Sequence, residues 1–181
     1  MKAYYFDNLP GDQRLPHDYV PSRPVSDEAL AAINVHHWRI PVENEDYEEQ
    51  LNAVAKERGY KNRDVLSISK EGLGDLYEEK IKGFYQEHIH EDEEIRYILE
   101  GSGFFDIREA PQDQWIRLAV APGDLLVVPA GIYHRFTLDE GNRVRTVRLF
   151  KDEPKWQAIY RSPETDNNPH RVEYLRSIQV A

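Results

Sequence analysis

Hydrophobic side chains change their spacing about halfway along the chain. Before residue 84 they recur at helical intervals in two segments, residues 45–58 and 73–81. After residue 84 they alternate with polar side chains, or form short apolar runs between turn residues. The first spacing predicts two amphipathic helices, and the second predicts a series of antiparallel strands.

The N-terminal quarter is expected to hold few regular elements. A short strand is predicted at residues 3–6, and Ser26 or Asp27 can cap a helix that runs to about Ile33. Prolines before residue 25 predict loop over much of that stretch. Gly59 is the expected end of the helix over residues 45–58.

Short strands are predicted throughout residues 84–150. They cover residues 84–90, 94–99, 103–108, 115–120, 125–128, 133–138 and 144–150. Short strands at such regular spacing are typical of an antiparallel sandwich or barrel. The tail beyond is expected to be irregular, because Pro163 and Pro169 interrupt it, and to be held on the barrel by Trp156 and Tyr160.

Composition narrows the class of protein. A chain of 181 residues fits one domain, residues 1–181, and no stretch approaches the ~20 apolar residues of a membrane helix. The sequence begins without the apolar run of a signal peptide. The absence of cysteine excludes thiolate metal sites and suits a reducing compartment, the cytoplasm or also the nucleus. A net charge of −10 argues against nucleic-acid binding.

Two clusters of metal-binding residue types lie in the strand region. His88, His90 and Glu94 form the first, and His134 ends the second. Each cluster alone is also compatible with surface or core histidines, but their combination favours one metal site. Nitrogen and oxygen donors without thiolate suit a redox-capable first-row ion better than a structural zinc. We therefore expect these four residues to bind one metal ion.

Strand alternation adds four more side chains to the expected site. If Glu94 points inward, Arg96 points inward too, and Arg148 shares its face with positions 144, 146 and 150. Phe84 and Phe136 share faces with predicted histidine ligands. The arginines can compensate an anionic substrate and the phenylalanines can line its pocket. Surface ion pairs and ordinary core packing are the alternative interpretations.

The remaining histidines are given structural roles. His36 and His37, beside Trp38, are expected to pack or to form hydrogen bonds. His17 and His170 lie in proline-rich stretches and are expected to be exposed.

The two clusters resemble the two motifs of the cupin superfamily. The first reads His-x-His, three residues, Glu, six residues and Gly101, and the second reads Gly123, five residues and Pro-x-Gly-x-x-His. Two departures stand out: Leu138 replaces an asparagine found in many cupins, and four residues instead of five separate Gly83 from His88. Neither departure removes a ligand.

Nearly the whole chain resembles the eukaryotic type of the acireductone dioxygenase family. The resemblance rests on Ala-Tyr-Tyr-Phe-Asp near the start and Asp-Gln-Arg-Leu-Pro-His ending at His17. It rests further on the run from Lys82 to Arg96, on Pro-Ala-Gly-Ile-Tyr-His-Arg-Phe-Thr from Pro129, and on Val-Arg-Leu-Phe ending at Phe150. It implies a cupin double-stranded β-helix (jelly-roll) barrel with a few short peripheral α-helices, mostly N-terminal. Residues 1–82 would pack on a core of residues 83–150, followed by a tail of residues 151–181.

The resemblance also implies a chemistry. His88, His90, Glu94 and His134 would bind one Fe²⁺ ion, with Ni²⁺ as the alternative metal. Arg96, Arg148, Phe84 and Phe136 would contact the substrate. That substrate is the acireductone 1,2-dihydroxy-3-keto-5-methylthiopentene of methionine salvage, which reacts with O₂.

Three alternatives remain open from the sequence. The chain can be a cupin enzyme of another class, such as an isomerase or a dioxygenase acting on a different substrate. It can be a non-catalytic cupin binding module, or it can have a scaffolding role in addition to catalysis. A monomer is the expected oligomeric state.

Overall fold

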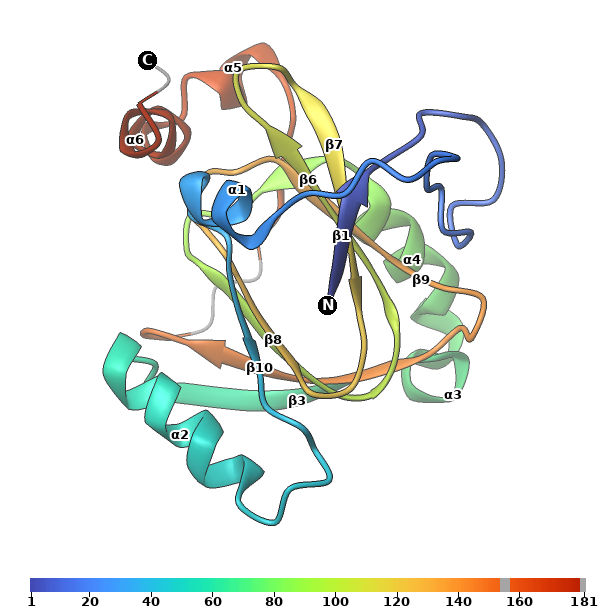
Figure 1. Cartoon of the computed structure of the whole chain (residues 1–181), viewed down its shortest axis with the longest axis vertical. Coiled ribbons are helices and arrows are strands. Elements are labelled where there is room, and N and C mark those ends of the chain that lie inside the picture. Colours follow the sequence, from blue (N-terminus) through green and yellow to red (C-terminus); the bar gives the residue numbers. More distant parts are fainter. Residues whose placement is uncertain (154–156, 180–181) are drawn as a thin grey trace.

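Two antiparallel β-sheets face each other and enclose the interior of the molecule (Figure 1). The computed structural model describes residues 1–153 and 157–179. One sheet has the order β1 (Lys2–Tyr5), β7 (Gln114–Val120), β6 (Gly103–Glu109), β9 (His134–Leu138), β4 (His88–Ile89) and β11 (Ile159–Tyr160). The other has the order β2 (His36–Arg39), β8 (Asp124–Val128), β5 (Glu94–Gly101), β10 (Val144–Phe150) and β3 (Asn62–Ile68). The predicted all-β barrel is confirmed.

The helices are short and lie outside the sheets (Figure 1). They are α1 (Asp27–Ala32), α2 (Tyr47–Arg58), α3 (Lys70–Leu73), α4 (Tyr77–Tyr85), α5 (Pro163–Asp166) and α6 (Pro169–Ser177). Ser26 caps α1 by accepting a hydrogen bond from the Ala29 amide, and Gly59 ends α2 with a left-handed φ of 76°. Both ends agree with the prediction. Within the described residues, no helix is long and apolar enough to cross a membrane.

Side-chain alternation along β5 separates the cavity from an outer core. Ile95 and Tyr97 are buried on the outer face, where they pack in one cluster with Ala55 of α2. Glu94 and Arg96 occupy the opposite face and line the cavity between the sheets. Because successive side chains of β5 point to opposite faces, Glu94 and Arg96 point into the cavity while the other face of the strand is apolar.

The predicted strand over residues 84–90 is wrong in its first half. Helix α4 continues to Tyr85, and β4 consists only of His88–Ile89. The helical spacing of Tyr77 and Ile81 extends to Phe84, so one apolar side of the helix packs, partly buried, against the core. The predicted helix over residues 73–81 is correspondingly too short, because α3, a 3₁₀ turn at Gly74–Leu76 and α4 together cover it.

The tail is more regular than its prolines suggested. Pro163 and Pro169 each stand at the start of a helix, where a missing N–H costs nothing and the fixed φ favours the first turn. Tyr174 of α6 is buried and donates a hydrogen bond of 3.0 Å to the Ile33 carbonyl. Tyr160 lies in β11, whereas Trp156 falls outside the described residues.

The N-terminal loop covers the outer face of the six-stranded sheet and buries charged groups there. His17 is 9% exposed, contrary to the prediction, and its Nδ1 lies 2.8 Å from the Asp7 carboxylate. Arg117 is fully buried, forms a bidentate pair with Asp106 and donates to the Leu15 carbonyl. These contacts satisfy groups that would be costly to bury alone.

Candidate metal centre and substrate cavity

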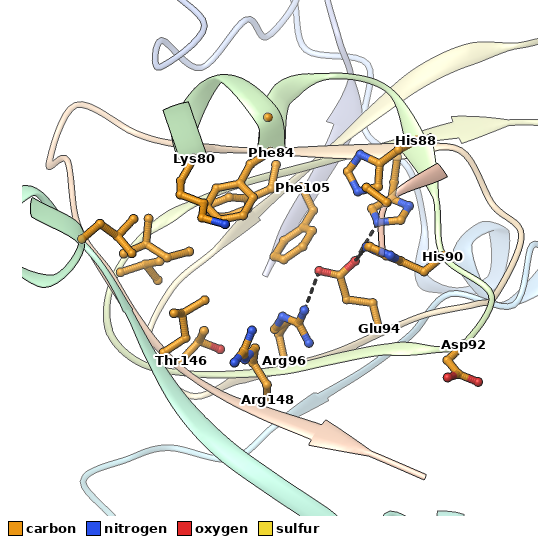
Figure 2. Close-up of a pocket in the computed structure, with 18 of the residues that line it drawn as sticks. Lys80, Phe84, His88, His90, Asp92, Glu94, Arg96, Phe105, Thr146 and Arg148 are labelled. Atoms are coloured by element: carbon orange, nitrogen blue, oxygen red, sulfur yellow. Dashed lines mark hydrogen bonds and ion pairs between the residues drawn. The ribbon is translucent and has the colours of Figure 1, made fainter. Parts of the chain in front are cut away.

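Three imidazoles meet at one end of the space between the sheets (Figure 2). His88 in β4 and His134 in β9 are direct cross-strand partners, and His90 follows β4 immediately. The ring centroid of His88 lies 4.5 Å from that of His134 and 4.8 Å from that of His90. One ring nitrogen from each histidine lies within 4.8 Å of the others, which is close enough for a shared ion.

Backbone carbonyls fix which nitrogen each histidine presents. The Nδ1 atoms of His88 and His134 lie 2.6 and 3.0 Å from the carbonyls of Gln86 and Ile132. The Nδ1 of His90 lies 3.0 Å from the carbonyl of Gln157 in the tail. A carbonyl only accepts hydrogen bonds, so Nδ1 carries a proton in each ring and Nε2 is the nitrogen that faces the other members of the cluster.

Glu94 adds a carboxylate to the three imidazoles from the opposite sheet. Its Oε2 lies 2.6 Å from Nε2 of His134 and 3.4 Å from Nε2 of His90. Burial raises the pKa of Glu94, but Arg96 and the two histidines outweigh burial and hold the pKa well below its usual range. Burial lowers the pKa of His88 to about 3. An ionised carboxylate and neutral imidazoles are the forms that bind metals.

Two arginines lie beside this cluster on the wall of the five-stranded sheet. Arg96 of β5 and Arg148 of β10 are cross-strand partners and share the inner face, as predicted. Arg96 forms an ion pair of 3.1 Å with Oε1 of Glu94, and Arg148 forms a bidentate pair with Asp64 of β3. Burial lowers the pKa of Arg96, and Arg148 lowers it further.

The cavity has a volume of about 730 Å³ and an apolar end. Phe84, Phe105 and Phe136 line this end, and Figure 2 shows the rings of Phe84 and Phe105. The ring of Phe136 lies 4.8 Å from that of Phe105 and 6.3 Å from that of Phe84, measured between centroids. Aliphatic side chains complete this end: Leu66, Ile68, Leu73, Ile98 and Val144.

All eight side chains predicted from the sequence line this one cavity: His88, His90, Glu94, His134, Arg96, Arg148, Phe84 and Phe136. Phe84 reaches it from helix α4, so the strand alternation used to place it does not apply.

The family model that matches residues 2–158 is that of the ARD/ARD' family. The chain belongs to the acireductone dioxygenase family.

Relatives within this family are similar over nearly their whole length. The acireductone dioxygenase 1 of Coprinopsis cinerea is 64% identical over 180 residues, which cover 99% of each chain. The acireductone dioxygenase of Aspergillus fumigatus is 53% identical, with 99% of this chain and 97% of the relative covered. A solved acireductone dioxygenase from Bacillus anthracis, with a cadmium ion in its active centre, is 27% identical. Its TM-score is 0.65, with 74% of this chain and 87% of that chain covered.

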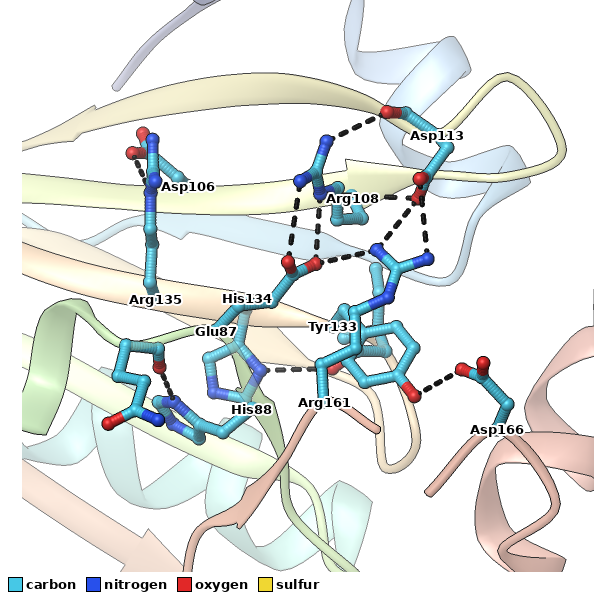
Figure 3. A network of polar contacts seen from close by, with 12 residues as sticks. Glu87, His88, Asp106, Arg108, Asp113, Tyr133, His134, Arg135, Arg161 and Asp166 are labelled. Atoms are coloured by element: carbon cyan, nitrogen blue, oxygen red, sulfur yellow. Dashed lines mark hydrogen bonds and ion pairs between the residues drawn. The ribbon is translucent and has the colours of Figure 1, made fainter. Parts of the chain in front are cut away.

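A polar network outside the cavity holds the tail against the histidine strands (Figure 3). Glu87, next to His88, accepts hydrogen bonds of 2.9 Å from both Arg108 and Arg161. The Arg161 guanidinium also stacks on the ring of Tyr133, the residue before His134. Arg161 of the tail therefore contacts the residue before His88 and the residue before His134.

Three features of the site were not predicted. Phe105 is the cross-strand partner of Phe136. Its position two residues from both Gly103 and Ile107 on β6 could have predicted that it faces the interior. Asp64 lies in β3, a strand for which no prediction was made. The Gln157 carbonyl acts through the backbone, so no side-chain pattern indicates it.

His36, His37 and His170 take the structural roles expected of them. His36 packs near Trp38, at 6.3 Å between ring centroids, and His37 bonds the buried Asp124 at 3.0 Å. His170 is exposed and pairs with Glu91.

Proposed function

We propose that this protein is an acireductone dioxygenase that oxidises 1,2-dihydroxy-3-keto-5-methylthiopentene with O₂. One observation carries the proposal: three imidazoles and the Glu94 carboxylate stand at one end of a cavity whose other end is apolar. The proposed substrate has the same division, with an ionisable enediol at one end and a methylthioalkyl chain at the other. Family membership supports the reaction class.

His88, His90, Glu94 and His134 are the proposed ligands of one Fe²⁺ ion, with Ni²⁺ as the alternative. The donor set fits either ion, because it combines neutral imidazoles with an ionised carboxylate and contains no thiolate. The cadmium ion in the Bacillus anthracis relative's active centre supports a metal site at this place in the fold. A bound ion supplies Lewis acidity toward the ionised enediol.

Arg96 and Arg148 are proposed to hold the charged end of the substrate. Both side chains line the cavity wall, Arg96 next to Glu94 and Arg148 directly across from Arg96, where little water screens them. An anion enters a cavity of this kind only against compensating positive charge, and the protein as a whole carries −10. The two arginines supply that charge locally and orient the substrate by charge-assisted hydrogen bonds.

Phe84 and Phe136 are proposed to bind the methylthioalkyl chain, together with Phe105. Their rings form one wall of the cavity, and each removes apolar substrate surface from water. The same wall excludes water from the reacting end of the substrate.

The metal is proposed to decide the products. With Fe²⁺ we expect 4-methylthio-2-oxobutanoate and formate, the products that serve methionine salvage. With Ni²⁺ we expect 3-methylthiopropanoate, formate and carbon monoxide. One donor set serves both ions, and intrinsic affinity rises from Fe²⁺ to Ni²⁺, so the ion found in purified protein reflects supply. Iron is the proposed working metal.

The deciding experiment combines metal analysis with product identification. Metal-free protein is loaded with Fe²⁺ or with Ni²⁺ and mixed with acireductone while oxygen uptake is recorded. We expect one ion per chain, rapid oxygen uptake and a different product set for each metal. Binding of acireductone without oxygen uptake would indicate a binding module, and uptake only with another enediol would indicate a different cupin dioxygenase.

Compartment and assembly complete the proposal. We place the protein in the cytoplasm, with the nucleus as a second location, because a chain without cysteine depends on no oxidising environment. We propose that it is a monomer with no nucleic-acid partner. Light scattering of the purified protein measures the assembly state, and fluorescence microscopy of the tagged protein measures its location.

A further inference from the structure

Four charged side chains form a row across the inner face of the five-stranded sheet. Glu94 and Arg96 lie on β5, Arg148 is the cross-strand partner of Arg96 on β10, and Asp64 is the cross-strand partner of Arg148 on β3. Residues directly opposite each other on adjacent strands share a face of the sheet. Figure 2 shows the first three members of this row beneath the cavity.

Asp64 holds Arg148 through both of its carboxylate oxygens. Nε of Arg148 donates to Oδ1 at 2.8 Å, and one terminal nitrogen donates to Oδ2 at 2.6 Å. The Arg148 side chain is 16% exposed and that of Asp64 is 39% exposed, so the pair lies at the edge of the cavity. A bidentate pair fixes the plane of the guanidinium as well as its position.

Arg148 needs such a partner because of its neighbour. Arg96 carries the same charge directly opposite it, and Arg96 is tied to Glu94 at 3.1 Å. Like charges in this arrangement repel each other. Because an arginine side chain has many rotamers, the repulsion favours rotamers of Arg148 that point away from Arg96. The Asp64 carboxylate offsets the repulsion and selects one rotamer.

We propose that Asp64 is a positioning residue that holds the Arg148 guanidinium in the orientation needed to meet the ionised substrate. The inference rests on the proposed function, since it deepens the role given there to Arg148. Asp64 is not among the side chains that line the cavity, and its hydrogen bonds to the lining go to Arg148. It also offsets part of the charge repulsion between Arg148 and Arg96.

Asp64→Asn tests the proposal because it removes the charge and keeps the size. We expect kcat/KM to fall about tenfold, mainly through kcat, because a misdirected guanidinium no longer orients the substrate. Asp64→Glu should recover kcat/KM to within about threefold of wild type by restoring a carboxylate. Glu100→Gln is the matched control: Glu100 lies on β5, outside the cavity lining, and pairs with Arg143 at 2.7 Å, so its loss should leave turnover unchanged.

A double-mutant cycle separates positioning from a general structural effect. In an Arg148→Gln background, Asp64→Asn should change kcat/KM by less than about twofold, since the residue it positions is gone. Equal losses in both backgrounds would overturn the proposal. A lower KM with unchanged kcat in Asp64→Asn would also overturn it, because that is the effect of net charge alone.

A second measurement does not depend on the substrate. In ¹⁵N-labelled protein, the Nε–H resonance of Arg148 is identified by its loss in Arg148→Gln. Asp64→Asn should shift this resonance and speed its exchange with water, and an unchanged resonance would overturn the proposal. Wild-type protein that consumes no oxygen with acireductone would instead contradict the proposed function, and the resonance would still decide whether Asp64 holds Arg148.

Discussion

Nε2 of His134 and Oε2 of Glu94 lie 2.6 Å apart although they belong to different sheets. His134 begins β9 of the six-stranded sheet, and Glu94 begins β5 of the five-stranded sheet. The proposed metal ion would therefore join the two halves of the barrel at one end.

Metal removal should lower the thermal stability of the protein. An ion that binds the folded state alone stabilises it by about 2.7 kcal/mol when its concentration is 100 times its Kd. For a chain of this size that corresponds to a Tm shift of roughly 5–10 °C. Differential scanning calorimetry of metal-free and Fe²⁺-loaded protein measures this Tm shift. Equal Tm values would argue against a metal site that joins the two sheets.

Glu94→Gln should lose metal without unfolding the barrel. An amide keeps the shape of the side chain but supplies no charge, so we expect metal affinity to fall by about 100-fold or more. Elemental analysis and circular dichroism measure the two effects. Glu91→Gln is the control, because Glu91 is exposed in the same turn and pairs with His170. Full metal content and turnover in the Glu94 variant would remove Glu94 from the ligand set.

Phe84→Ala should weaken binding of the apolar end of the substrate. Loss of about 1 kcal/mol of apolar contact raises KM for acireductone about fivefold. An analogue that lacks the methylthio group should show the same KM in both proteins, because it never reaches Phe84. Tyr85→Ala, at the next position of α4 and outside the cavity lining, should leave both KM values unchanged.

Asp124 should make the protein sensitive to acid. Burial raises the pKa of this carboxyl, but hydrogen bonds from His37 and the Ala121 amide outweigh burial and lower the pKa below 3.8. The stabilisation is therefore complete above pH 3.8 and is lost as the pH falls through the lower, folded-state value.

Denaturant unfolding of wild type and Asp124→Asn between pH 2 and pH 6 measures this contribution. We expect the variant to lose about 3 kcal/mol at pH 6, because it leaves charged partners of a buried group unpaired, and less at pH 2. A difference that does not depend on pH would assign the loss to packing.

Local alternation predicted the inner faces of β5 and β10 correctly. The prediction for Arg96 and Arg148 required only the correct strand and the correct inward face, because every second side chain of a strand then points inward. Phe84 reached the predicted cavity for a different reason, since helical spacing from Tyr77 through Ile81 carries it there. Correct placement of a residue therefore did not require the correct element.

The contacts that support the site depend on which strands pair. β3 mixes polar and apolar residues, and only its pairing with β10 brings Asp64 to Arg148. His17 was expected to be exposed because prolines surround it, but the loop folds back and buries it against Phe6. Sequence periodicity predicts which face of a strand or helix a residue occupies. It does not predict these contacts, because they join segments far apart in the chain.

The Gln157 carbonyl that orients His90 gives the site an order of completion during synthesis. The strands that carry the proposed ligands and both arginines leave the ribosome first, and the carbonyl that sets the protonated nitrogen of His90 follows after β10. A domain folds as a unit, so the orientation of His90 is fixed only once Gln157 has been synthesised. Capture of the proposed ion in its final geometry would accordingly come late in the synthesis of the chain.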